Sequence, residues 1–229
     1  METLIKLNNQ AAGRDKMARI LQYGSRALWF YMQQKKMNHQ TIEKLRALEF
    51  TFSSFRKLLR LGKCVDVMYS ALSSIHYPNI TVRVTTTLSR ISMSLYLLAD
   101  HILWIGRTGL CAVNGEKWGK VANKYWMYAL LMNLVRDIYE IHRILKLRQV
   151  SLSDFFSDGC DARKKLATCA RDHRDVIVDT VKNACDVVIP LTALGFLNFS
   201  PGSVGLCGVV SSAAALLTLI DPLLKLTPS

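Results

Sequence analysis

Histidine and cysteine, the residue types that most often bind metals or act as bases and nucleophiles, are spread thinly along this chain. The five histidines lie on different segments, and the six cysteines include no Cys-x-x-Cys pair that could form half of a zinc site. No Gly-rich phosphate loop, dinucleotide-binding fingerprint, Gly-x-Ser-x-Gly elbow or His-Glu-x-x-His motif occurs. The sequence therefore predicts no catalytic residue, no metal site and no cofactor, and we do not expect an enzyme.

The main feature of the sequence is an excess of positive charge on segments that also have apolar stripes. The net charge is +13 although half of the residues are apolar, and residues 1–63 hold 13 Lys and Arg against 4 Asp and Glu. Such an excess favours either nucleic acid or an anionic lipid surface as partner. Nucleic-acid binding needs base-stacking aromatics or a groove-reading module beside the basic stripe. Here the basic residues share helices with large apolar stripes, so the predicted partner is anionic membrane lipid and not nucleic acid.

Residues 52–63 combine both properties in one short amphipathic segment. Its apolar anchors are Phe52, Phe55, Leu58 and Leu59, and its cationic face consists of Arg56, Lys57, Arg60 and Lys63. Helices of this composition lie among lipid headgroups, with the apolar face down and Lys and Arg toward anionic lipid. The pattern is also that of an ordinary surface helix packed on a domain core. Both interpretations hold if the domain can open.

Residues 187–220 carry no charged residue and are bracketed by Asp186 and Asp221. This is longer than the ~20 apolar residues that cross a bilayer core. We expect Pro190 and the turn-forming residues 200–203 to break the block, which leaves residues 204–220 as the predicted transmembrane helix. The alternative, a soluble core helix, would have to hide every side of an apolar helix inside a small domain.

Small residues crowd this predicted span. Gly208 and Ser212 are four residues apart, the spacing that lets two membrane helices approach closely, and Ser211 and Ala215 form a second such pair. We interpret the Gly208/Ser212 pair as a helix–helix contact in the membrane that supports self-association. The alternative is that Gly and Ala are simply common in membrane helices.

The remaining segments also have helical periodicity, and strand-like alternation is missing. Helical regions are expected at 3–34, 40–76, 79–107 and 116–148. The third carries a heptad stripe suited to packing against another helix, formed by Val84, Leu88, Ile91, Leu95, Leu98, Ile102 and Ile105. On the fourth, a solvated polar face is expected, formed by Asn133, Arg136, Asp137, Glu140 and Arg143.

These segments predict an all-α, helical membrane protein, with amphipathic helices packed as a bundle and a C-terminal transmembrane helix. We divide the chain into a basic amphipathic helical region (1–78), a helical hairpin with the heptad-patterned helix (79–150), a polar linker (151–175) and a C-terminal membrane-anchoring region (176–229).

Several short stretches together resemble the peroxin-11 family of peroxisomal membrane proteins, in order along nearly the whole chain. They are residues 56–62 (RKLLRLG), 103–106 (LWIG), 116–118 (EKW), 133–141 (NLVRDIYEI), 181–186 (VKNACD) and 201–212 (PGSVGLCGVVSS). The resemblance implies a peroxisomal membrane protein with both termini in the cytosol. It also implies an amphipathic helix that inserts into the outer leaflet, and residues 52–63 match that helix. Animal members often carry a longer loop where this chain has only residues 150–175.

The resemblance further implies that the chain elongates the peroxisomal membrane and promotes fission, recruiting fission factors and a dynamin-related GTPase. The expected mechanism is physical: a helix wedged into one leaflet expands it, and self-association concentrates the effect. A peroxisomal membrane channel for small metabolites is the alternative, and it would require polar residues that line several spans. A GTPase-activating role would require an exposed Arg that enters a partner's site.

Overall fold

A computed structural model describes residues 7–147, 168 and 171–226, and among these residues it contains helices and connections but no β-strand. In chain order the helices are α2 (Ala11–Gln34), α3 (His39–Leu59), α4 (Lys63–Ser74), α5 (Ile80–Arg107), α6 (Gly115–Leu147), α9 (Arg174–Ala193), α10 (Pro201–Ile220) and the 3-10 helix η1 (Pro222–Leu224). The predicted all-α class, with a bundle and an apolar C-terminal helix, is confirmed.

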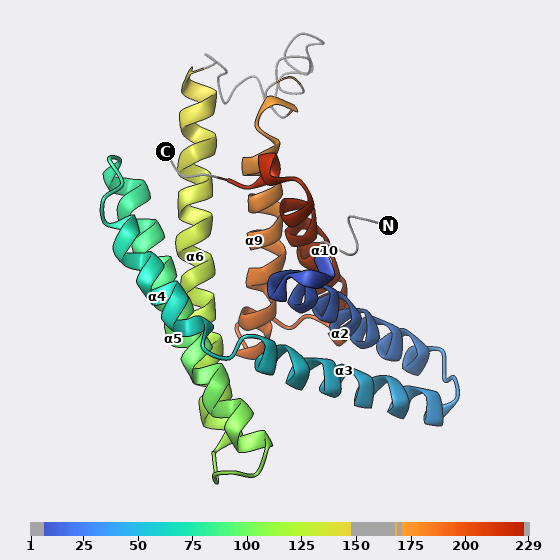
Figure 1. Cartoon of the computed structure of the whole chain (residues 1–229). Helices are drawn as coiled ribbons and strands as arrows, with labels where there is room; N and C mark the ends of the chain where they lie inside the picture. The colour runs from blue at the N-terminus through green and yellow to red at the C-terminus, as the bar shows by residue number, and fades with distance from the viewer. Residues whose placement is uncertain (1–6, 148–167, 169–170, 227–229) are drawn as a thin grey trace.

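The helices pack as a continuous series of neighbours. α4 lies on α5, α5 on α6, α6 on α9, α9 on α10, α10 on α2, and α2 on α3. The hairpin of α2 and α3 lies across the direction of α6 and α9 (Figure 1). Because α3 also contacts α5, helices from the first and last parts of the sequence together surround the centre of the bundle.

Local sequence signals set several helix ends. Asn79 caps α5 by accepting hydrogen bonds from the backbone of the first turn, and Ser200 does the same for α10. The helical region expected over residues 40–76 is divided, since α3 ends at Leu59 and α4 begins after Gly62. Gly62 has a φ of 78°, a left-handed conformation that favours glycine. The amphipathic segment 52–63 therefore spans a bend and is not one helix.

Pro190 does not break the apolar block, contrary to expectation. It lies inside α9, which continues to Ala193. Proline has no N–H to donate to the carbonyl four residues earlier, and α9 ends three residues after it. The chain turns after Gly195, which has a φ of 83°, and α10 contains the whole of the predicted span 204–220.

The burial pattern is the reverse of that of a soluble protein. Among the described residues, buried polar and charged side chains are at least as numerous as buried hydrophobic ones, and large hydrophobic side chains are exposed on all of the long helices. The heptad stripe of α5 was therefore wrongly interpreted as a packing seam. Val84, Leu88 and Leu98 of that stripe are 49%, 46% and 50% exposed. Apolar side chains lose nothing by facing lipid, so a regular stripe can mark the outside of a membrane protein.

Small polar residues take the inner positions instead. Ser89 of α5 donates hydrogen bonds to the side chain of Asn133 (2.7 Å) and the backbone oxygen of Ala129 (3.1 Å) on α6. Ser94 donates to the backbone oxygen of Cys64, at the start of α4, over 2.8 Å. Contacts of this kind, made by small side chains that allow close helix approach, are typical of helix packing in membranes.

Most of the polar linker predicted over residues 151–175 lies outside the described residues, which include only 168 and 171–175 of it. Its last part, from residue 174, belongs to α9.

Candidate functional site

The predicted membrane-remodelling segment has its apolar side chains outside. Phe55 and Leu58 are exposed, while Phe52 and Leu59 are partly covered. Exposed apolar residues continue beyond the bend at Leu61 and along α4. We refer to Phe55, Leu58, Leu61, Val65, Met68, Tyr69 and Leu72 as the outer apolar set. Water does not favour this exposure, so the set marks a surface for lipid or for a protein partner.

Three of the four cations of the same segment point into the bundle, and not outward as the sequence predicts. Arg56 and Lys57 are buried and Arg60 is nearly so, whereas Lys63 is exposed. The reason is that carboxylates from other helices meet these cations inside the bundle. Contact of the segment with anionic lipid stays a prediction, and for Arg56, Lys57 and Arg60 it would require the bundle to open.

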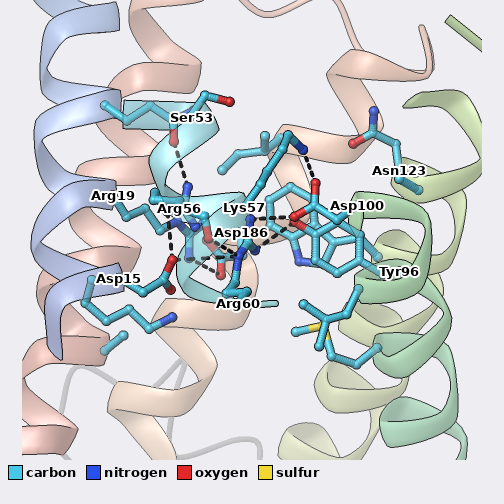
Figure 2. A pocket seen from close by; sticks show the side chains of 18 of the residues that line it. Asp15, Arg19, Ser53, Arg56, Lys57, Arg60, Tyr96, Asp100, Asn123 and Asp186 are labelled. Carbon is cyan, nitrogen blue, oxygen red and sulfur yellow. Dashed lines mark hydrogen bonds and ion pairs between the residues drawn. The ribbon is translucent and has the colours of Figure 1, made fainter. Parts of the chain in front are cut away.

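Inside the bundle, the three inward cations join a larger group that we call the central cluster. It comprises five basic residues, Lys16, Arg19, Arg56, Lys57 and Arg60, and three carboxylates, Asp15, Asp100 and Asp186. These side chains come from α2, from α3 and the residue that follows it (Arg60), from α5 and from α9, and they point toward one another, as Figure 2 shows for those that are labelled.

Asp15 and Asp100 bind the cations at the C-terminal end of α3. Arg56 Nε donates to Asp15 Oδ1 over 3.1 Å, and Arg60 Nη2 donates to Asp100 Oδ2 over 2.7 Å. Lys57 Nζ also pairs with Asp100. Both carboxylates are nearly inaccessible to solvent, so each ion pair lies in a medium that strengthens it and makes its loss costly.

Asp186 connects α2, α9 and α10. Arg19 Nη1 and Nη2 donate to its two carboxylate oxygens over 3.2 and 2.5 Å, and Ser211 donates its hydroxyl proton to the same carboxylate. The Arg19 and Asp186 side chains are 5% and 8% exposed. Arg19 Nε has no hydrogen-bond partner among the described residues, although it is buried.

Aromatic rings orient the guanidinium groups. Tyr96 and Trp126 are stacked with ring centres 5.5 Å apart, and Arg60 lies 5.7 Å from the Tyr96 ring. Arg19 lies 5.5 Å from the Tyr23 ring and 5.8 Å from the Trp126 ring. Such cation–π contacts fix the planes of the guanidinium groups while leaving N–H edges available for anions.

The central cluster lines a cavity of about 670 Å³. Typical ligand sites have volumes of about 300–1,000 Å³. Further cations on its wall include Arg107 and Lys63, and the described residues contribute no carboxylate to the wall beyond the three of the central cluster. The cavity is therefore strongly cationic.

The excess of positive charge shifts the ionisation of its members. Burial opposes ionisation of Asp15, but the charges of Arg56, Arg60 and Lys16 outweigh it, so the pKa of this carboxyl lies below its usual value. Lys16 has its pKa lowered to about 7, first because the bundle excludes water around it and then because Arg19 repels its charge. Arg56 also repels Lys16, and Asp15 and Asp186 offset only part of this.

A second buried group lies between α6 and α9. Arg136 pairs with Asp137 over 2.8 Å and also with Asp179, and Asn183 donates to Asp137 over 2.6 Å. Asp137 and Asn183 are fully buried. The polar face predicted on this helix is therefore not solvated, since α9 covers much of it. Asp137 has a raised pKa because burial, together with the nearby Asp179, disfavours its charge.

The small residues of α10 pack within the chain. A Cβ atom added at Gly205 would lie 2.8 Å from the backbone nitrogen of Ala27 and 2.9 Å from the backbone oxygen of Tyr23. Gly208 packs directly on the Tyr23 ring, and Ser212 is fully buried. The predicted Gly208/Ser212 contact thus has α2 of the same chain beside it, and a role in self-association stays a prediction.

Within the described part of the chain, no group of three or more His, Cys, Asp or Glu side chains could hold a metal ion.

α10 is the one described helix that is long and apolar enough to cross a membrane. The channel alternative needs polar side chains along several spans, and one candidate span among the described residues does not support it.

Comparison with known proteins gives a consistent result over the whole chain. The family model of peroxisomal biogenesis factor 11 (PEX11) matches residues 1–220. The chain is 34% identical over 258 residues to peroxisomal membrane protein 11B of Bos taurus and 32% identical over 267 residues to that of Homo sapiens, with all of each chain covered. It is 33% identical over 245 residues to peroxisomal membrane protein 11A of Mus musculus, with 99% of each chain covered. No solved structure matches the chain.

Proposed function

This chain belongs to the peroxisomal biogenesis factor 11 (PEX11) family, and from that premise we propose that it remodels and elongates the peroxisomal membrane and so promotes peroxisome fission. The family and the relatives, whose names are those of peroxisomal membrane proteins, support the location. The role in remodelling is not enzymatic and rests on how the chain meets lipid.

The observation that carries the proposal is the outward direction of the apolar side chains at the end of α3 and on α4. Tyr69 is 73% exposed and Val65 is 67% exposed, and both follow directly on the predicted remodelling segment. Full burial of one large apolar side chain is worth about 1.5–3 kcal/mol, so several of them provide a strong driving force for insertion into one leaflet. A wedge in one leaflet expands it and favours curvature.

The inward cations make this insertion possible without exposing charge to lipid. Arg56, Lys57 and Arg60 pair with Asp15 and Asp100 inside the bundle, so the outer side of the segment presents apolar groups and the inner side presents ion pairs. α10 supplies the spanning anchor. Self-association, which would concentrate wedges into a tubule, and recruitment of fission factors and a dynamin-related GTPase complete the proposed mechanism.

Expression of the full chain in cells with a fluorescent peroxisomal marker tests the proposal. We expect the chain to lengthen peroxisomes and then raise their number, and we expect the double variant Phe55→Ser/Leu58→Ser to reach the same membrane without lengthening it. The matched control is Leu110→Ser, which makes the same polar change at an exposed leucine between α5 and α6. Equal elongation by the double variant would show that these side chains are not the wedge.

A further inference from the structure

The central cluster contains more positive than negative charge. Its five basic residues face three carboxylates, so two positive charges have no matching acid when all the basic groups are protonated. Burying unmatched charges in a protein interior is unfavourable, and the cost is relieved when an anion binds or when a group loses its proton.

We propose that the cavity lined by the central cluster binds a phosphate group that carries close to two negative charges, from either a phosphate ester or a lipid headgroup. A phosphate monoester has a charge of about −1.5 to −2 at pH 7, so it offsets more of the unmatched positive charge than one carboxylate would.

One unpaired cation indicates where the phosphate would sit. Lys16 of α2 lines the cavity and has no ion pair within 4.0 Å among the described residues. A phosphate oxygen beside Lys16 would accept hydrogen bonds from its ammonium group. The lowered pKa of Lys16, whose burial and repulsion by Arg19 remove its proton near neutral pH, fits a cation that still lacks its anion.

Lys16 provides the cleanest test, because replacing it breaks no observed ion pair. The experiment uses the full chain in nanodiscs of phosphatidylcholine and measures thermal stability and equilibrium binding. One arm adds inorganic phosphate or ATP, and the other includes phosphatidylinositol 4-phosphate in the nanodisc. Stabilisation in the first arm identifies a free phosphate compound as the ligand, and stabilisation in the second arm alone identifies a lipid headgroup.

In the arm that responds, we expect Lys16→Gln to weaken binding by about tenfold or more, since it removes a charged hydrogen bond. Lys16→Arg should retain binding, and Lys44→Gln, at an exposed lysine on α3, should behave as wild type. The unliganded Lys16→Gln protein should be at least as stable as wild type, which separates a ligand-binding residue from a structural one. No stabilisation in either arm, or equal binding by Lys16→Gln, would overturn the proposal. Membrane elongation is measured separately, so either proposal can fail alone.

Discussion

Replacing Asp186 with Asn removes one negative charge from the centre of the bundle while keeping the side chain's shape. Arg19 would remain buried, with its guanidinium facing an uncharged amide in place of a carboxylate that now accepts bonds of 3.2 and 2.5 Å. With both side chains less than a tenth exposed, solvent cannot compensate for the loss. Removing one partner of a buried ion pair typically costs about 3–5 kcal/mol.

At about 1.4 kcal/mol per factor of ten, this loss would lower the ratio of folded to unfolded protein by roughly two to four powers of ten. The assay is unfolding of the full chain in mixed detergent micelles, followed by tryptophan fluorescence. Trp126 reports on the site directly, since Arg19 lies 5.8 Å from its ring. The control is Glu116→Gln, which breaks the exposed pair with Lys120 and should cost less than about 1 kcal/mol.

The double variant Arg19→Met/Asp186→Leu should recover most of the lost stability, because replacing a whole buried pair by apolar groups is often neutral or stabilising. The reasoning fails if Asp186→Asn unfolds within about 0.5 kcal/mol of wild type, a difference usual for surface changes. That result would mean that Arg19 does not depend on Asp186 for its burial.

Three further outcomes follow from the structure. Deleting residues 204–220 should release the chain into the alkaline-carbonate-soluble fraction, whereas retention in the membrane pellet would place the anchor elsewhere. Gly205→Leu should separate α10 from Tyr23 and Ala27 and lower stability in the micelle assay by about 1–3 kcal/mol, as overpacking does, while Gly119→Leu, where a side chain meets open space, should not. Burial lowers the pKa of both Lys16 and Lys57 from 10.5 in the unfolded chain to about 7 in the folded one, so the unfolding free energy should rise between these pH values in wild type. Lys16→Gln should lose about half of this rise, and an undiminished rise would exclude Lys16 as a cause.

The helical class and the spanning helix could be predicted because both depend on local sequence. An uncharged block bounded by Asp186 and Asp221, with turn-forming residues at 200–203, is enough to locate α10 to within three residues. The bend at Gly62 was harder to predict, since a single glycine often lies within a helix.

The direction in which the helices face could not be predicted from periodicity. An apolar stripe such as that of Val84, Leu88 and Leu98 has the same spacing whether it packs on a helix or faces lipid. The central cluster could not be predicted from the sequence for a different reason. Arg19 and Asp186 are 167 positions apart, and only the fold brings them together. The one available signal was Asp100, an acidic residue within an apolar stretch of α5.

The central claim, that the outer apolar set lies in the bilayer, is tested most directly by the depth of its side chains. Nitroxide labels are placed one at a time at Leu58 and Leu72 of a cysteine-free full chain in anionic liposomes, with a label at Lys120, whose side chain is 63% exposed, as the aqueous control. Collision with oxygen reports lipid, and collision with a water-soluble nickel chelate reports water. We predict that the labels at Leu58 and Leu72 meet oxygen and are shielded from nickel, unlike the label at Lys120. Nickel accessibility equal to that at Lys120 would contradict the account.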